Sequence, residues 1–300
     1  MKESRVAIAA ILVTFKKDEL LKSALTSVNE QSLKPNIVFV VDNAQSESTK
    51  AMALAHNAIY LAGENQYGGA GGFAHGLQEA MSRGFKMFWL LDDDGRASKT
   101  CLENLFIARE KYNLEIVGPL SVSLHDDNKT ANPVVLGIKK NEDVHKLQKL
   151  HMIPNKAQFF NGILFSIAVI EKIGLPDKRL FIRGDEIDFN LRCKRFFTSG
   201  LITNAIYYHP SSENEYPGKR TAILSANIPL DSVKKFYQFR NRGYIIRRHH
   251  QYHLAIYDWI RYPLRFLVLN RFDLHAFLYW SRTWLKGFRY DLSPFESSES

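Results

Sequence analysis

Met87-Phe88-Trp89-Leu90-Leu91-Asp92-Asp93-Asp94 joins an apolar run to three consecutive aspartates. The apolar run predicts a buried strand, and the carboxylates follow at its C-terminal end. Ligands of open α/β sheets bind at that end of the strands. Three adjacent negative charges repel one another, so they need either full hydration or a compensating cation. The stretch therefore predicts an α/β fold with an acidic site at one edge of its sheet.

Side chains alternate along extended backbone, which predicts that Asp92 and Asp94 point to the same side. Two carboxylates placed in this way can bind one divalent cation, and oxygen ligands favour Mg²⁺ or Mn²⁺ over Zn²⁺. A hydrated acidic turn is the alternative for an isolated triplet. The preceding strand and the polar residues at other strand ends favour the metal site.

Strand-like and helix-like segments alternate up to the triplet, with short connections between them. Apolar runs predict strands at residues 6–13, 37–41, 58–61 and 87–91, and helical periodicity predicts helices at 19–31, 46–55 and 73–83. This order is typical of right-handed βαβ units in a doubly wound, mostly parallel sheet. Beyond the triplet we expect strands at 115–120, 133–138 and 201–208, a helix at 187–197, core residues at 159–165 and a surface excursion at 139–155.

The composition is that of an ordinary globular protein, with 45% hydrophobic and 24% charged residues in 300. No signal peptide is found, and no apolar stretch approaches the about 20 residues that span a bilayer, so a cytoplasmic protein is expected. Only Cys101 and Cys193 are present, both in apolar surroundings. A disulfide scaffold and a structural zinc site are therefore disfavoured, and we expect both thiols to be buried.

The net charge of +9 belongs to the C-terminal part of the chain. Residues 231–290 hold 12 Lys and Arg against 3 Asp and Glu, which leaves 28 of each kind elsewhere. We therefore divide the chain into a domain at 1–228 and a basic helical segment at 229–300, with an interruption expected at Pro263 and a disordered tail at 296–300.

The basic segment is also rich in aromatic residues. Such a composition suits the interface of an anionic bilayer, where the protein would be a peripheral membrane protein. A helical cap on the first domain and a homo-oligomer interface are the alternatives. The interleaved residues are Trp259, Tyr262, Phe266, Phe272, Phe277, Tyr279, Trp280 and Trp284 with Arg261, Arg265, Arg271, Arg282 and Lys286.

Polar residues also follow the first two strands: Thr14, next to Phe15, after the first and Asp42-Asn43 after the second. Asp42 either closes a turn onto its own backbone or accepts hydrogen bonds from a nucleobase or ribose.

A glycine-rich loop is expected before the helix at 73–83, where it can present N–H groups to a phosphate or sugar. It lacks the Walker A Gly-Lys-Ser/Thr and is not GxGxxG on a first βα turn. The loop spans residues 65–73, and its candidate binding residues are Asn65, Gly68, Gly69, Gly71 and Gly72.

Two later elements add acid–base groups. Asp185-Glu186 opens a predicted helix, where acidic residues either complement the helix dipole or supply a general base. His209 ends a predicted strand. With Asp92 and Asp94 already proposed for a metal, His209 becomes a candidate third ligand.

As an ordered set over about residues 6–210, these features resemble inverting glycosyltransferases of family 2 with the GT-A fold. The glycine-rich loop followed by the full Asp triplet is most similar to bacterial galactofuranosyltransferases, whereas rhamnosyltransferases usually lack the full triplet. Residues 236–242, Phe-Tyr-Gln-Phe-Arg-Asn-Arg, also resemble the segment that follows the catalytic domain in both groups.

The resemblance implies UDP-galactofuranose as donor, Mn²⁺ or Mg²⁺ as cofactor and a growing, lipid-linked glycan as acceptor. Asp92, Asp94 and His209 would bind the metal, and Glu186 would be the base at a position where the family usually has Asp. Asp185 remains the other candidate base. The nucleotide sugar would contact Asp42 at its uridine, together with Thr14, Phe15, Asn43, Asp93 and the residues of the glycine-rich loop.

Three other functions remain open at this point. A rhamnosyltransferase would use dTDP-rhamnose on the same scaffold. A basic, non-enzymatic RNA-binding or membrane-binding module would explain the C-terminal charge but not the acids at strand ends. A sugar nucleotidyltransferase usually has glycines and basic residues on its first strand turn, whereas residues 14–18 are Thr-Phe-Lys-Lys-Asp, without glycine.

Overall fold

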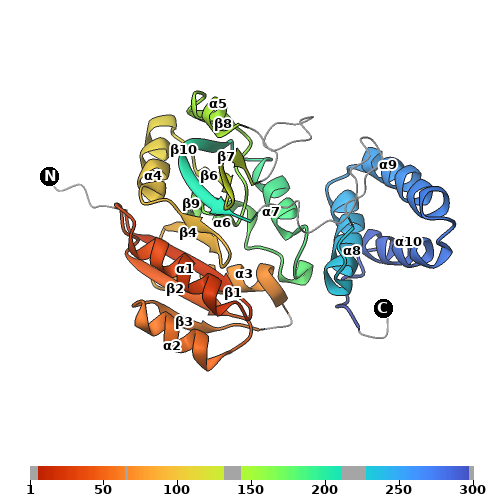
Figure 1. Ribbon diagram of the computed structural model, residues 1–300, viewed down its shortest axis with the longest axis horizontal. Coiled ribbons are helices and arrows are strands. Elements are labelled where there is room, and N and C mark those ends of the chain that lie inside the picture. The colour runs from red at the N-terminus through yellow and green to blue at the C-terminus, as the bar shows by residue number, and fades with distance from the viewer. Residues whose placement is uncertain (1–5, 65–66, 132–142, 211–227, 297–300) are drawn as a thin grey trace. The chain divides into compact units, whose positions relative to one another are not determined.

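The computed structural model describes residues 6–64, 67–131, 143–210 and 228–296 (Figure 1). The chain forms two compact units. The first consists of Met1–Lys178 and Phe189–Ser211, and the second of Arg179–Asp188 and Ser212–Ser300. The grouping of Arg179–Asp188 with the C-terminal helices was not expected from the sequence pattern.

The first unit is built on one mixed sheet. Strands β3 (Ile59–Ala62), β2 (Ile37–Asp42), β1 (Ile8–Thr14) and β4 (Met87–Asp92) lie side by side in parallel. The sheet continues through β9 (Ile163–Ser166), β6 (Ile116–Ser123), β10 (Ser199–His209) and β5 (Arg96–Ala97). β9 is antiparallel to both neighbours, and β6 and β10 are parallel. The predicted mixed, mostly parallel α/β sheet is confirmed.

Helices cover both faces of this sheet, because alternate residues of β1 point to opposite sides. Ile8, Ala10 and Leu12 pack in the core that includes α1 (Asp18–Asn29) and α4 (Cys101–Tyr112). Ala9, Ile11 and Val13 pack in the core that includes α3 (Gly68–Ser82) and α6 (Ile167–Ile173). All seven residues of β1 are buried, which is why its sequence is a continuous apolar run. Two further helices are α2 (Glu47–Ala55), in this unit, and α7 (Asp185–Cys193), whose residues are divided between the two units.

The expected glycine-rich loop is instead the beginning of α3, and this correction has a packing reason. Gly68, Gly69, Gly71 and Gly72 all lie in the first turns of the helix. A Cβ on Gly72 would lie 2.5 Å from Cγ1 of Val13, so the glycines allow α3 to approach β1 closely. Close approach outweighs the low helix propensity of glycine here. Asn65 lies outside the described residues.

Part of the polar stretch at 139–155 also differs from the surface excursion expected there. Its described residues form α5 (Val144–Gln148), with Val144 and Leu147 buried, and β8 (Met152–Pro154), which pairs with β10. The strand expected at 133–138 lies outside the described residues, and β7 (Asp126–Thr130) pairs with β6. Both cysteines are buried, as predicted.

The second unit contains α8 (Ser232–Arg248), α9 (Tyr252–Pro263), a π-helix η4 (Leu264–Leu269) and α10 (Leu274–Phe288). The interruption expected at Pro263 is therefore a change from α- to π-helix, and the helical path ends at Leu269. α10 packs along α8, and a Cβ on Gly287 would overlap the carbonyl oxygen of Arg240 in α8.

This unit has an apolar core of its own. It includes Tyr262, Phe266, Trp280 and Trp284, which the sequence assigned to a possible bilayer interface. Within the described part of the chain, no helix is both long and apolar enough to cross a membrane.

Candidate active site

Three side chains that could hold a metal ion converge at the carboxyl ends of β4 and β10. Asp92 ends β4, Asp94 follows two residues later, and His209 ends β10. One ligand atom of each lies within 4.8 Å of the others. The Nδ1 atom of His209 is 2.8 Å from the carbonyl oxygen of Pro210, so Nδ1 carries a proton and Nε2 faces the carboxylates. Nε2 lies 3.2 Å from Oδ1 of Asp94.

The charges of this cluster are not balanced within the protein alone. Burial raises the pKa of Asp92 to about 7, and the negative charges of Asp94 and Asp93 add to the effect. Burial would also raise the pKa of Asp94, but contact with His209 and the charge of Lys17 hold it below the ordinary carboxyl range. Burial lowers the pKa of His209, and Asp94 more than reverses this, so the ring is readily protonated. The raised pKa values of Asp92 and His209 indicate that added positive charge is favourable at this cluster.

The donor atoms suit a hard divalent cation. Oδ1 of Asp94 is buried and accepts no well-aligned hydrogen bond among the described residues, although Nε2 of His209 is near it. A buried carboxylate oxygen without a donor is costly unless a cation binds it. Two carboxylates and one imidazole fit Mn²⁺ or Mg²⁺ with open positions left for a ligand.

Asp93 points the other way and ties two strand ends together. Its Oδ2 accepts a hydrogen bond from Thr14 Oγ1 at 2.9 Å and from the Phe15 N–H at 3.4 Å. Its Oδ1 is 3.0 Å from Nζ of Lys17, which also lies 3.2 Å from Asp94. Asp93 is only 2% exposed, and both of its carboxylate oxygens already contact groups of this protein. Its proposed contact with the nucleotide sugar stays a prediction.

Lys17 is a site residue that the sequence analysis did not identify. Burial would lower the pKa of its ammonium group, but the carboxylates of Asp93 and Asp94 reverse this and raise it above the ordinary lysine value. Lys17 is therefore a fixed cation beside the acidic cluster. Its position in the loop after β1, at the same sheet edge as the Asp triplet, is the feature of the sequence that could have indicated this role.

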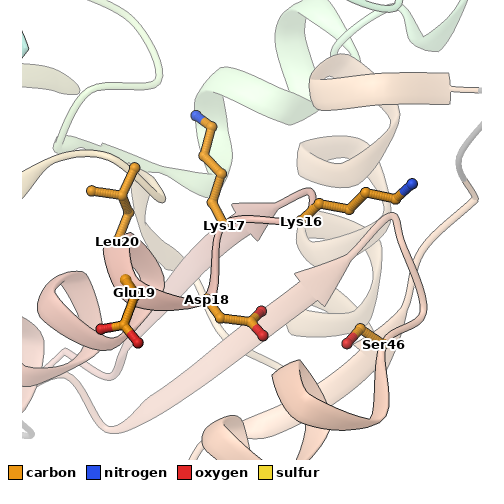
Figure 2. A pocket seen from close by; sticks show the side chains of 6 residues that line it. All are labelled: Lys16, Lys17, Asp18, Glu19, Leu20 and Ser46. Carbon is orange, nitrogen blue, oxygen red and sulfur yellow. The ribbon is translucent and has the colours of Figure 1, made fainter.

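A hollow of about 480 Å³ lies beside this loop (Figure 2). Lys16, Lys17, Asp18, Glu19 and Leu20 come from the loop after β1 and the start of α1, and Ser46 comes from the connection between β2 and α2. Figure 2 shows the two lysine side chains extending in different directions, with Asp18 on the side of Ser46. The hollow lies at the same sheet edge as the acidic cluster.

Asp42 and Asn43 mainly organise the turn after β2. Asp42 is fully buried and accepts hydrogen bonds from the N–H groups of Ala44 and Ser46, at 2.9 and 2.7 Å. Closing this turn is one of the two roles that the sequence suggested for Asp42. The other, a contact with uridine, stays a prediction. Asn43 donates to the carbonyl oxygen of Gly68 at 2.8 Å, which holds the start of α3 against β2.

Asp185 and Glu186 open α7 and belong to the second unit. Asp185 is 7% exposed, and its burial raises its pKa well above the ordinary carboxyl range, with the charge of Glu186 adding to the effect. Glu186 Oε2 accepts a hydrogen bond from the N–H of Gly184 at 3.1 Å. Two adjacent carboxyl groups therefore occupy different environments, as paired acids and bases often do.

The backbone before this pair is held by α8. Asn241 is fully buried and donates to the carbonyl oxygens of Leu180, Ile182 and Arg183 at 2.7 to 3.0 Å. Residues 181, 183 and 184 have φ values of 63°, 63° and 104°, and such conformations persist only where the surroundings impose them. Arg240 donates to the carbonyl oxygen of Arg179 at 2.6 Å.

Farther along α7, Asp188 pairs with the end of α8. Its Oδ1 lies 2.9 Å from His249 Nε2 and 3.2 Å from Arg248 Nη1. Two residues of the 236–242 segment, Arg240 and Asn241, thus hold the backbone before the candidate base, a role that the sequence pattern does not reveal.

Comparison with known proteins identifies the family. The family model described as Glycosyl transferase family 2 matches residues 9–168, which include β1, β4 and the Asp triplet. The chain belongs to glycosyl transferase family 2. It is 32% identical over 285 residues to galactofuranosyltransferase GlfT1 of Mycolicibacterium smegmatis, which covers 92% of this chain and 94% of that protein. It is 25% identical over 252 residues to dTDP-rhamnosyl transferase RfbF of Shigella flexneri, with 81% of each covered.

Solved structures support the fold. TarS 1–349 from S. aureus is 13% identical, has a TM-score of 0.56 and covers 95% of this family 2 chain and 81% of its own. The same protein in complex with UDP gives a TM-score of 0.57 at 10% identity, whereas another TarS structure is covered to only 44% of its length. The predicted family and GT-A-type fold are confirmed, and the non-enzymatic and nucleotidyltransferase alternatives are set aside.

Proposed function

We propose that this glycosyltransferase moves galactofuranose from UDP-galactofuranose to a hydroxyl group of a growing glycan. The convergence of Asp92, Asp94 and His209 at the strand ends of a family 2 chain is the observation that carries the proposal. The choice of sugar rests on the relatives named galactofuranosyltransferase, which are more similar over more of the chain than the rhamnosyl transferase.

Asp92, Asp94 and His209 would hold Mn²⁺ or Mg²⁺. A cation bound there would neutralise negative charge on the diphosphate of the leaving nucleotide. Lys17 supports the same task, since it offsets Asp93 and Asp94 from the protein side. Lys16 and Ser46 line the neighbouring hollow, which is large enough to receive part of a nucleotide.

Glu186 is the proposed general base. It would accept the proton of the acceptor hydroxyl as that oxygen bonds to the anomeric carbon and the bond from this carbon to UDP breaks. Attack from the face opposite the leaving UDP inverts the anomeric centre. Burial raises the pKa of Asp185 well above the ordinary carboxyl range, which favours Glu186 over Asp185 as the base.

The acceptor is proposed to be lipid-linked, which places the enzyme at an anionic membrane surface. Residues 1–228 would carry donor binding, and residues 229–300 would contact that surface. The interface of a homo-oligomer is the competing role for the second segment.

Transfer assays with purified protein test this function. UDP-galactofuranose, dTDP-rhamnose and UDP-galactopyranose are each supplied with Mn²⁺ and synthetic lipid-linked acceptors, and products are identified by mass spectrometry. We expect transfer only from UDP-galactofuranose, with loss of activity in chelator and in Asp94→Asn. Transfer from dTDP-rhamnose alone would replace the donor assignment, and activity that survives complete chelation would overturn the metal assignment.

A further inference from the structure

The surface of the second unit exposes an unusual amount of apolar side chain. Among the described residues, ten of the twenty exposed large hydrophobic residues lie between residues 252 and 278. Soluble proteins rarely leave apolar surface gathered in this way unless it binds a partner. The ten are Tyr252, Ile256, Tyr257, Trp259, Ile260, Val268, Leu269, Phe272, Leu274 and Leu278.

Helical geometry arranges many of these residues along one path. Tyr252, Ile256 and Ile260 are four residues apart in α9, and neighbours at this spacing lie on the same side of an α-helix. Each four-residue step overshoots a full turn by about 40°. A π-helix takes more residues per turn, so η4 reverses part of this drift before the series reaches Val268. The apolar path thus continues from α9 to the turn before α10.

The same spacing on α10 leads from apolar to basic residues. Leu274 and Leu278 are exposed at 50% and 39%, and Arg282 and Lys286 follow at the next two four-residue steps. Leu274 and Arg282 are about 12 Å apart along the helix axis, since each residue adds about 1.5 Å. Arg282 and Lys286, with Arg289, also line a hollow of about 350 Å³. Along α10 the exposed apolar residues therefore lie near its start and the basic residues toward its end.

The charge of residues 252–290 indicates which kind of partner this apolar surface would bind. From residue 252 to 290 the only acids are Asp258 and Asp273. Asp258 is fully buried and paired with Arg242 and Arg261, while Asp273 caps the start of α10. A second copy of the chain would bring like charges together across a two-fold interface, which is unfavourable. An anionic lipid surface instead offers both an apolar layer and negative charge.

We propose that the outer face of α9, η4 and the start of α10 docks into the interface of an anionic bilayer, with the basic residues of α10 at the headgroups. Ile256, Ile260 and Phe272 would enter the acyl boundary. Only the purpose of this docking, which is to bring the enzyme to a lipid-linked acceptor, rests on the proposed function.

Vesicle flotation of the full-length chain tests the proposal. Vesicles contain phosphatidylcholine alone or phosphatidylcholine with 30% phosphatidylglycerol, without donor or acceptor. We expect wild-type protein to float with the anionic vesicles, and Ile256→Ser/Ile260→Ser/Phe272→Ser to bind at least tenfold more weakly. Leu54→Ser/Ile107→Ser/Phe196→Ser removes three exposed apolar residues of the first unit as a matched control and should bind like wild type.

Two further measurements separate the alternatives. Arg271→Gln/Arg282→Gln/Arg289→Gln should also weaken binding at least tenfold, and circular dichroism verifies that each variant is folded. The apolar variant should keep wild-type transfer to a short, water-soluble acceptor, so lost membrane binding is distinguishable from a wrong donor or reaction. Equal flotation of the apolar variant and wild type would overturn the proposal, as would a dimer that only this variant converts to monomer while no form binds vesicles.

Discussion

Asn241 donates a hydrogen bond to the carbonyl oxygen of Leu180 over 2.7 Å, across 61 positions of sequence. The same amide also reaches the carbonyls of Ile182 and Arg183. Because all of these groups precede Asp185-Glu186, Asn241 fixes the backbone from which the candidate base extends. The resemblance of residues 236–242 to other glycosyltransferases thus acquires a structural reason.

Asn241→Leu is expected to lower both stability and turnover. The substitution leaves buried carbonyl groups without donors, at a cost of about 2–4 kcal/mol in the free energy of unfolding. We expect kcat to fall at least tenfold with little change in the donor KM, because the base loses its position. Urea unfolding and steady-state kinetics measure the two effects. Asn104→Leu, which removes an amide donor to the carbonyl of Asn204 at the protein surface, should change neither by more than a small amount.

The two candidate bases should respond differently to neutral substitution. Glu186→Gln removes the proton acceptor, so we expect kcat to fall by about 10²–10⁴-fold with a nearly unchanged KM. Asp185→Asn should cost less than tenfold, because burial raises the pKa of that carboxyl and so favours its neutral form, which asparagine resembles. Glu186→Asp should recover part of the activity. The reverse order of effects would assign the base to Asp185.

Stabilisation by Mn²⁺ should increase with pH. In the metal-free protein the pKa of Asp92 is raised to about 7 by burial and by its acidic neighbours, so a cation must displace a proton at pH 6 but not at pH 8. A metal concentration 100-fold above Kd stabilises a protein by about 2.7 kcal/mol, which corresponds to several degrees in Tm. We expect differential scanning fluorimetry to show at least twice the shift at pH 8. An equal shift at both pH values contradicts the competition.

Asp92→Asn separates proton linkage from metal binding. The folded protein binds this proton more tightly than the unfolded chain, whose Asp has a pKa near about 4. The stabilising contribution of the neutral carboxyl is therefore complete below pH about 4 and is lost as pH rises through about 7. At pH 8 the metal-free variant should be more stable than wild type by about 1–2 kcal/mol, since Asp92 is partly exposed and water moderates the effect. The variant should also lose the stabilisation by Mn²⁺.

Gly287→Ala tests the contact between α8 and α10. The added methyl group would overlap the carbonyl of Arg240, so the helices must move apart at a cost of about 1–3 kcal/mol. The intrinsic preference of alanine for helix acts in the opposite direction and is smaller. Chemical denaturation measures the difference, with the exposed His275→Ala on the same helix as the control. A stabilised Gly287→Ala would contradict the close approach.

The sheet edge could be predicted because it depends on local sequence. Continuous apolar runs identify β1, β2 and β4, and parallel strands deliver Thr14, Asp42 and the Asp triplet to one edge. The approach of His209 follows from the end of another strand. The roles of these residues in binding and catalysis remain predictions.

Other features depend on contacts that the sequence pattern does not record. Gly72 looks like a loop residue until Val13 is seen against it, because glycine is a poor helix former in isolation. Lys17 becomes a site residue only through a side chain that reaches Asp93, 76 positions later. Pro263 suggests an end to a helix, whereas the chain accommodates it at a change of helical type.

The attachment of the acidic pair to α8 also affects how such enzymes can be recombined. A hybrid that kept this chain's strands but took its C-terminal helices from a relative would keep the support of residues 180–183 only if the new helix had an asparagine at the position of Asn241. The tail of the chain therefore cannot be exchanged as an independent accessory, and substitutions in it and in the loop before Asp185 should be inherited together.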